Sequence, residues 1–232
     1  MQKIGLIGGL SWVSTAEYYR QINQRLQRRL GGVASPRIVL ESVNRQAYVD
    51  AVIDRRDEAA ALAQILDAAR AAERAGADFL VITCNDVHRF VPDIQPHLSI
   101  PFLHIADATA DAIERAGLTR VGLLGVRKTM EGSFYGDILG PRGIAALVPD
   151  EPDRSYVHDR IYDEMVHDVF TDATRAGYQR VIGNLASRGA QGIVLACTEI
   201  PLLLSGEDVD LPTFSTTDLH CAAAIDRVVA AL

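Results

Sequence analysis

Short runs of β-branched and other apolar residues alternate along the chain with longer stretches in which apolar residues recur at helical spacing. The short runs predict buried parallel strands, because each is largely apolar and is bounded by glycine, proline or polar residues. These strands are expected at residues 4–7, 37–42, 79–83, 121–124 and 193–196.

A helix is expected between the second and third of these strands. Within residues 54–75, Leu62, Ile65 and Ala69 follow helical spacing, and Gly76 comes next as a C-terminal stop. Strand–helix alternation of this kind predicts an α/β fold, in which an open parallel sheet carries helices on both faces.

The sequence also repeats itself. Residues 75–86 align with residues 188–199 at an offset of 113 positions (84 to 197), and residues 3–8 align with residues 120–125 at an offset of 117 (3 to 120). This period is too long for a solenoid repeat, whose units are about 20–50 residues long. The repeat therefore indicates two similar halves.

We expect these halves to be two pseudo-symmetric α/β lobes, each with its own open parallel sheet. The first lobe is predicted to comprise residues 1–104 plus 213–232, and the second residues 105–212.

Composition and charge narrow the class of protein. The chain of 232 residues is 48% hydrophobic and 23% charged, which is typical of a globular protein. A net charge of −7 argues against non-specific nucleic-acid or anionic-membrane binding, both of which need a basic surface. No apolar run approaches the length of a spanning helix, and the N-terminus leads directly into a strand-like run. We expect a cytoplasmic protein.

The chain has three cysteines, Cys84, Cys197 and Cys221, with no CxxC pair and no zinc-ligand spacing. An odd number of cysteines in a reducing compartment makes a structural disulfide an unexpected arrangement. Cys221 lies among alanines on an expected helix, so we assign it to packing.

Cys84 and Cys197, in contrast, occupy equivalent positions of the repeat and each directly follows a predicted strand. Ligands of open α/β sheets bind beyond the carboxyl ends of the strands. The polar pairs that follow, Asn85-Asp86 and Thr198-Glu199, are expected to cap helices whose dipoles favour a thiolate.

Two thiols that approach one carbon atom from opposite faces are suited to stereoinversion, in which one base removes a proton and an acid on the other side returns one. A single cysteine after a buried strand is more often a small core residue. The occurrence of Cys84 and Cys197 at repeat-equivalent positions favours the catalytic interpretation.

These residues resemble a known family. Residues 4–15 (IGLIGGLSWVST), the Cys84-Asn85 pair, residues 197–199 (CTE) and residues 101–108 (PFLHIADA) are similar to the aspartate/glutamate racemase family, the cofactor-independent amino-acid racemases. The resemblance extends over nearly the whole chain, and the glycine-rich start together with the paired cysteines makes it specific.

The resemblance implies two lobes with the active site between them, a homodimer, a small amino-acid substrate, and no pyridoxal phosphate or other cofactor. It further implies that Cys84 acts on the D-enantiomer and Cys197 on the L-enantiomer.

The same resemblance implies a set of substrate-binding residues. Asn85, Asp86 as the next residue and Thr198 would hold the substrate α-carboxylate, and the loop at Leu10 and Ser11 would close over it.

One departure from the family concerns Asp86, where the family usually has threonine. If Asp86 and its repeat equivalent Glu199 both face the substrate, an acidic side chain is repelled, and neutral or cationic amino acids are favoured. The alternative is that Asp86 caps its helix and faces solvent. Basic residues in regions where the family often holds an acidic substrate are arginines: Arg45, Arg55, Arg56 and Arg160.

Other functions remain open on the sequence alone. A hydantoin racemase or a maleate isomerase, which acts on a small diacid, has the same layout, whereas an arylmalonate decarboxylase typically keeps one thiol. A small-ligand binding protein would need neither thiol. His88, one turn beyond Cys84, is expected either to tune that thiol or to satisfy local polar groups, and no histidine pair has metal-ligand spacing.

Overall fold

The computed structural model describes all 232 residues, and these fold into two compact units. Unit 1 comprises residues 1–104 and 220–232, and unit 2 comprises residues 105–219. Each unit is an α/β layer structure built on a parallel sheet, which confirms the predicted fold class. No helix is both long enough and apolar enough to cross a bilayer.

Unit 1 is built on a three-stranded parallel sheet of order β2-β1-β3, with an isolated parallel bridge from β3 to Phe102. Its elements in chain order are β1 (Lys3–Gly8), α1 (Trp12–Leu30), β2 (Arg37–Ser42), α2 (Arg45–Val49), a π-helical turn (Asp50–Asp54), α3 (Glu58–Arg74), β3 (Phe79–Ile82), a 3₁₀ turn (Asp86–Phe90), α4 (Val91–Ile94) and a second 3₁₀ turn (Gln95–His97).

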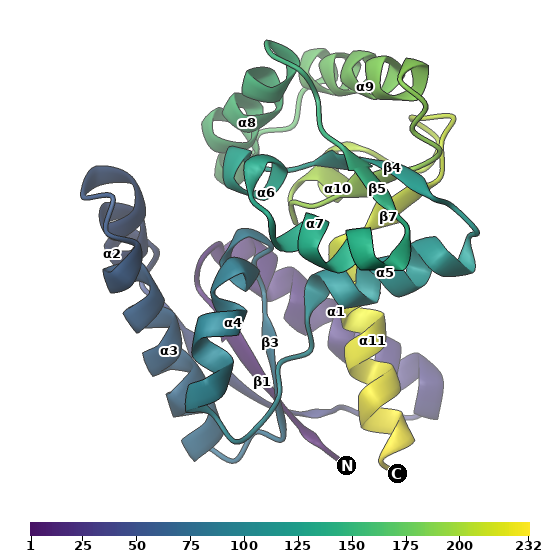
Figure 1. Cartoon of the computed structure of the whole chain (residues 1–232). Helices are drawn as coiled ribbons and strands as arrows, with labels where there is room; N and C mark the ends of the chain where they lie inside the picture. Colours follow the sequence, from purple (N-terminus) through teal and green to yellow (C-terminus); the bar gives the residue numbers. More distant parts are fainter. The chain divides into compact units, whose positions relative to one another are not determined.

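Both faces of this sheet are covered, because successive side chains of a strand point to opposite sides. In β3, Phe79 and Val81 pack with helix α1 and the C-terminal helix α11 (Thr216–Ala230). Leu80 and Ile82 pack on the other side against α3 and the segment that contains α4. Figure 1 shows these two helical layers on either side of β1 and β3.

Unit 2 is built on a four-stranded parallel sheet of order β5-β4-β6-β7. Its elements are α5 (Ile105–Arg115), β4 (Arg120–Leu124), α6 (Arg127–Glu131), α7 (Phe134–Leu139), a 3₁₀ turn (Gly140–Arg142), β5 (Ala145–Leu147), α8 (Asp153–Asp163), a 3₁₀ turn (Met165–His167), α9 (Asp172–Ser187), β6 (Ile193–Leu195), α10 (Ile200–Leu203), β7 (Thr213–Ser215) and the start of α11.

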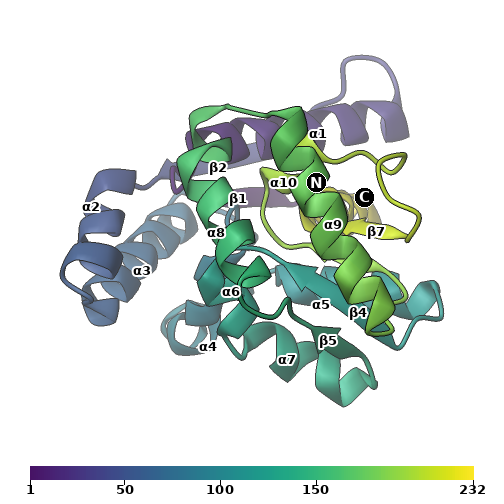
Figure 2. The same ribbon diagram turned by 90° about the horizontal axis from the view of Figure 1, so that it is seen from above.

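The faces of the second sheet divide in the same way. Leu124, Ile193 and Leu195 pack against α8 and α9, whereas Val121 and Val194 pack against α5 and α7 (Figure 1). The two green helices α8 and α9 face the viewer in Figure 2.

An inner strand of each sheet carries a glycine where neighbouring side chains pack closely. A Cβ atom added at Gly5 would lie 2.8 Å from the Cβ of Ala77 and 2.7 Å from a methyl group of Leu80. At the repeat-equivalent Gly122, an added Cβ would lie 2.8 Å from a methyl group of Ile193. The repeat therefore preserves a packing constraint as well as a pattern of apolar residues.

Three details differ from the sequence prediction. Residues 213–219, expected in the first lobe, lie in unit 2, because β7 pairs with β6. The expected helix over residues 54–75 begins only at Glu58, since Asp50–Asp54 form a π turn and Asp57 caps α3. The short strands β5 and β7 were not predicted, because three residues give too little periodicity to recognise.

Candidate active site

Cys84 lies just beyond the end of β3, and its side chain is half-buried. Thr83, the residue before it, ties this segment to the N-terminal part of α1. The hydroxyl of Ser14 donates a hydrogen bond to the carbonyl of Thr83 (2.7 Å), and the hydroxyl oxygens of Thr15 and Thr83 lie 3.1 Å apart.

The predicted loop at Leu10 and Ser11 belongs to the same neighbourhood. The Thr15 hydroxyl accepts a hydrogen bond from the backbone N–H of Gly9 (3.0 Å), and the Ser11 side chain caps α1 by accepting from the N–H of Ser14. The loop and the segment that ends in Cys84 are therefore joined through the first turn of α1. Leu10 is buried and Ser11 is partly exposed.

Asp86 does not cap a helix. It is the first residue of the 3₁₀ turn, and the guanidinium of Arg89 donates to both its carboxylate (2.5 Å) and its carbonyl oxygen (2.9 Å). Asn85, which precedes it, is buried and makes no side-chain cap hydrogen bond. The expectation that the Asn85-Asp86 pair caps a helix is wrong.

Arg89 also links this turn to two other elements. It donates to Glu58 at the start of α3 (2.8 Å) and to the hydroxyl of Tyr48 in α2 (3.2 Å). Burial alone would lower the pKa of Arg89, but Asp86, Tyr48 and Glu58 together raise it above the usual value. Burial and then the Asp86 carboxylate raise the pKa of Tyr48, so its hydroxyl stays neutral.

A buried cluster of three histidines and a tyrosine lies in unit 1. The ring centroid of His88 is 4.8 Å from that of His104 and 5.4 Å from that of His220. Nδ1 of His88 lies 2.8 Å from the carbonyl oxygen of Cys84, and Nε2 of His220 lies 2.8 Å from the carbonyl oxygen of Leu103.

A carbonyl oxygen can only accept, so these contacts fix the tautomers. His88 carries its proton on Nδ1 and donates it to Cys84. His220 carries its proton on Nε2 and accepts from the hydroxyl of Tyr18 at Nδ1 (3.0 Å). Burial, followed by the neighbouring histidines, lowers the pKa of His88 well below its usual value, and burial lowers the pKa of His220 to about 4. Both rings are neutral at physiological pH.

His88 was expected either to tune the Cys84 thiol or to satisfy local polar groups. The structure shows a hydrogen bond to a local polar group, the backbone carbonyl of Cys84. The rest of the cluster was not predicted, because Tyr18, His104 and His220 are far apart in sequence. No group of histidine, cysteine or acidic side chains in the structure is arranged to hold a metal ion.

Cys197 lies in unit 2 just beyond the end of β6 and is also half-buried. Its thiol donates a hydrogen bond to the carboxylate of Glu199 (Sγ to Oε2, 3.0 Å). The hydroxyl of Thr198 donates to the same oxygen (2.7 Å), and both Thr198 and Glu199 are buried.

The Thr198-Glu199 pair, like Asn85-Asp86, does not cap through its side chains. The helix that follows, α10, has only four residues, and the 3₁₀ turn after Cys84 has five. Turns this short provide little macrodipole, so the expected dipole stabilisation of a thiolate loses most of its physical basis.

Tyr178 of α9 is an ionisable group that interacts with Cys197. Burial and then the Cys197 sulfur raise the pKa of Tyr178 well above its usual value, so this phenol is neutral, and it donates to the carbonyl of Val157 (3.0 Å). Glu164 is bound by the guanidinium of Arg160 and by the hydroxyl of Thr174.

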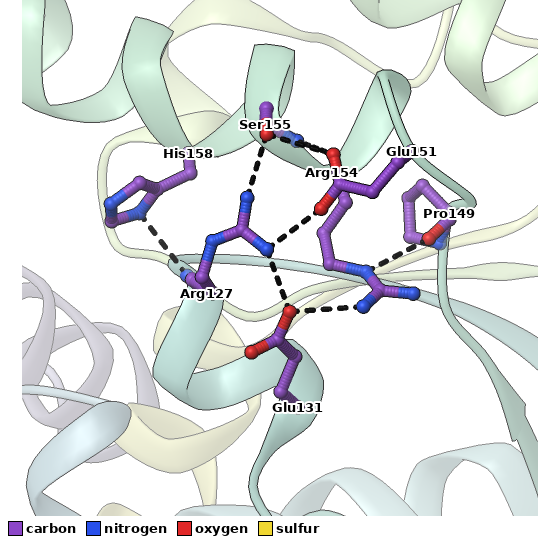
Figure 3. Close-up of polar contacts among 7 residues, drawn as sticks. All are labelled: Arg127, Glu131, Pro149, Glu151, Arg154, Ser155 and His158. Atoms are coloured by element: carbon purple, nitrogen blue, oxygen red, sulfur yellow. Dashed lines mark hydrogen bonds and ion pairs between the residues drawn. The ribbon is translucent and has the colours of Figure 1, made fainter.

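The start of α6, directly after β4, is fixed to α8 by an arginine-centred network (Figure 3). Arg127 donates to the carboxylates of Glu131 and Glu151 (2.7 Å each) and to the hydroxyl of Ser155 (2.6 Å). Its backbone N–H donates to Nδ1 of His158 (3.2 Å). Hydrogen bonds from Arg127 and then Ser155 lower the pKa of Glu151 to about 2. The Arg127 cation is therefore engaged with carboxylates.

The arginines that were candidates for holding an acidic side chain differ in their surroundings. Arg160 is committed to Glu164 and Asp163, with its guanidinium 5.9 Å from the Tyr156 ring centroid. Arg45 is half-buried in α2, whereas Arg55 and Arg56 are exposed beyond the π turn.

Comparison with known proteins was made for the whole chain. The family model described as Asp/Glu/Hydantoin racemase matches residues 7–224. The broad-specificity amino-acid racemase RacX of Bacillus subtilis (strain 168) is 24% identical over 230 residues, which cover 98% of each chain.

Two solved structures are also similar. A candidate Asp/Glu racemase from Yersinia pestis is 40% identical, with a TM-score of 0.91 and coverage of 99% of this chain and 100% of that one. An aspartate racemase homologue from Pyrococcus horikoshii OT3 is 28% identical, with a TM-score of 0.84 and the same coverage of both chains. These matches confirm the family resemblance, and the protein is an enzyme of the Asp/Glu/Hydantoin racemase family.

Proposed function

We propose that the protein is an amino-acid racemase that needs no pyridoxal phosphate, and that Cys84 and Cys197 are its two proton-transfer groups. The observation that carries this proposal is the equivalent placement of the two thiols. Each is half-buried and directly follows a parallel strand, β3 in unit 1 and β6 in unit 2. The carboxyl ends of parallel strands are where α/β enzymes bind small molecules.

The reaction begins with one sulfur as thiolate and the other as thiol. The thiolate removes the proton from Cα, and the electron pair of the broken C–H bond is delocalised towards the carboxylate. The opposite thiol then donates its proton to the other face of Cα. The product is the other enantiomer, and the two sulfurs have exchanged protonation states.

We further propose that Asn85 and Thr198 help to hold the α-carboxylate, with Leu10 and Ser11 forming a loop over the substrate. The connection of that loop to Thr83 through Ser14 and Thr15 supports its assignment to the Cys84 side. Asp86 contributes less charge than its sequence position suggests, because Arg89 binds its carboxylate.

The side chain of the substrate is not restricted to acidic groups in this proposal. Arg89, in the turn that follows Cys84, and Arg160, which acts on Tyr178, are bound to carboxylates of this chain. They therefore offer little net positive charge to an acidic substrate. RacX, which matches over the whole chain, is described as broad in specificity, and we propose a similarly tolerant site here.

Deuterium exchange in D₂O tests the reaction class. Each proteinogenic amino acid, both as the L- and as the D-enantiomer where available, is incubated with enzyme, and Cα deuteration is followed by NMR. A racemase introduces deuterium at Cα of its substrates. Absence of exchange with every amino acid, together with turnover of a hydantoin or of maleate in a parallel assay, would contradict the proposal and support the corresponding alternative.

The proposal also concerns cofactor use. Because both proton-transfer groups belong to the chain, activity should survive EDTA and extensive dialysis, with no absorbance in the pyridoxal band. Loss of activity on chelation, restored by a metal ion, would contradict it. The mechanism requires reduced thiols and thus fits the cytoplasm. The homodimer implied by the resemblance stays a prediction.

A further inference from the structure

The acidic residues that follow the two thiols have different partners. Glu199 lies two residues after Cys197 and accepts a hydrogen bond from its sulfur (3.0 Å). Asp86 lies two residues after Cys84, and its carboxylate is instead bound by Arg89 (2.5 Å). The repeat places an acid at the same position in both units, and in unit 2 this acid is in contact with the thiol.

The difference has a cause in the sequence. Under the repeat offset of 113 (84 to 197), the position of Arg89 in unit 1 is occupied by Leu202 in unit 2. Leu202 is 45% exposed and has no charge to offer. Glu199 consequently has no arginine at the position from which Arg89 binds Asp86. Its buried carboxylate accepts hydrogen bonds from Cys197 and Thr198 instead.

From the contact between the Cys197 sulfur and the Glu199 carboxylate we infer that Glu199 holds Cys197 in the protonated form in the resting enzyme. Because the proposed reaction starts with one thiol and one thiolate, Cys84 is then the sulfur that becomes the thiolate first. A carboxylate in contact with a thiol favours S–H over S⁻, through both the hydrogen bond and like-charge repulsion. Glu199 is thus a positioning residue that acts on the proton of Cys197.

The other charged groups packed around Cys197 do not oppose this assignment. Tyr178 on α9 is neutral. Arg160 of α8 and Glu164, just beyond its end, both act on Tyr178 and form an ion pair with each other, so their charges largely offset. The Glu199 carboxylate is in direct contact with the sulfur.

For catalysis the inference rests on the proposed function. The resting enzyme is then prepared for the enantiomer whose Cα proton faces Cys84, which the family resemblance implies is the D form. Enantiomers are equal in free energy, so kcat/KM has the same value in both directions whatever the resting protonation state. The asymmetry must therefore be measured on the thiols themselves.

The test is alkylation of the enzyme by iodoacetamide without substrate, with each cysteine followed by peptide mass spectrometry as a function of pH. Only the thiolate reacts, so the pH of half-maximal rate reports ionisation of each sulfur. We expect a lower midpoint for Cys84 than for Cys197. Glu199→Gln should lower the Cys197 midpoint by about one pH unit or more, which is about tenfold in rate below the midpoint.

Asp86→Asn is the matched control. It removes the equivalent charge of unit 1, yet it should move the Cys84 midpoint less, because the Asp86 carboxylate is held in an ion pair with Arg89, which Glu58 shares. An unchanged or higher Cys197 midpoint in Glu199→Gln would overturn the inference.

If Glu199→Gln does not fold, the pH profile of alkylation in the wild-type enzyme is the test. A midpoint for Cys197 at or below that for Cys84 would then contradict the inference. No turnover is involved, so failure of the proposed racemase activity would be seen separately in the deuterium-exchange assay.

Discussion

Different side chains adjoin the two cysteines: in unit 1 a histidine binds the main chain of Cys84, and in unit 2 a carboxylate contacts the sulfur of Cys197. Beside Cys84, the neutral ring of His88 donates to the backbone carbonyl of the cysteine. Beside Cys197, the carboxylate of Glu199 accepts from the sulfur. In the repeat alignment (84 to 197), the position of His88 is taken by Pro201, which has no donor to offer.

This comparison separates what a repeated fold preserves from what it leaves variable. Parallel strands β3 and β6 deliver a cysteine to the same position in each unit. The units have diverged four and five places further on, where unit 1 has His88 and Arg89 and unit 2 has Pro201 and Leu202. A racemase must reach one carbanion from two faces, but nothing requires the two proton donors to be held in the same way.

The largest expected effect comes from removing either thiol. Cys84→Ser and Cys197→Ser should each lower kcat by about 10²–10⁴-fold or more, because a serine hydroxyl is a poor base at neutral pH. Racemisation is measured by chiral chromatography, with circular dichroism to confirm folding. Cys221→Ala is the control, since Cys221 is a residue of α11 that is buried in the core of unit 1 and should be dispensable for the chemistry. Near-wild-type turnover of either serine variant would remove that sulfur from the mechanism.

The histidine cluster predicts a pH dependence of stability that arises in unit 1. His88 and His220 have lowered pKa values in the folded protein, so the unfolded chain binds protons more readily. Their contribution is fully present above the unfolded pKa of about 6.5 and is lost as the pH falls towards about 4 for His220.

Urea unfolding at pH 7 and pH 5 measures this effect. The free energy of unfolding should fall by about 1–2 kcal/mol per histidine between these values. His220→Asn should show a smaller difference between the two pH values than the wild type. Equal stability of the wild-type protein at both pH values would show that the rings are not held neutral.

Close packing predicts that replacing the two repeat-equivalent glycines, Gly5 and Gly122, with alanine will destabilise the protein by different amounts. Gly5→Ala should destabilise the protein by about 1–3 kcal/mol, because its new Cβ meets the immobile Cβ of Ala77. Gly122→Ala should cost less, since its neighbours are the ends of the Ile193 and Leu185 side chains, which can shift. Thermal unfolding measures both.

Gly183→Ala is the matched control for these substitutions. An added Cβ at this exposed position in α9 would have no neighbour within 4 Å, so the variant should gain up to about 1 kcal/mol of helix propensity. Equal losses at Gly5 and Gly122 would show that their packing is less different than the structure indicates.

The smallest expected effect concerns Asp86. Asp86→Thr, which restores the residue usual in the family, should change the kcat/KM ratio of aspartate to alanine by less than about fivefold, because Arg89 already offsets the carboxylate. Competition assays with both amino acids measure this ratio. A much larger gain for aspartate would mean that Asp86 acts on the substrate as an unneutralised charge.

Apolar patterning was sufficient to predict the α/β class and five of the strands, because β1, β3, β4 and β6 are largely buried and leave a nearly unbroken apolar run. The prediction that residues 37–42 form a buried strand is wrong in one respect, since β2 lies at the edge of its sheet and is partly exposed. The strands β5 and β7 were not predicted, because each has three residues and its place in the sheet depends on pairing with β4 or β6. Pairing across a sheet leaves no signal in a local window.

The site was predictable in part for a similar reason. The repeat alone singled out Cys84 and Cys197, since equivalent strands end at both. The capping prediction failed, because a polar pair before a helix indicates a cap without showing which partner its side chains meet. The hydrogen bond between Cys197 and Glu199 and the ion pair between Arg89 and Asp86 are side-chain contacts that only the folded structure shows.

The central claim is that two different sulfurs serve the two faces of Cα, and the position of the solvent label tests it most directly. A single unlabelled enantiomer is incubated with enzyme in D₂O, and both enantiomers are separated and analysed by mass spectrometry early in the reaction. With Cys84 and Cys197 as separate proton-transfer groups, the product should carry deuterium while the remaining starting enantiomer stays almost unlabelled. Deuterium in the recovered starting enantiomer at the rate of product formation would show that a single exchanging base serves both faces, and would contradict the account.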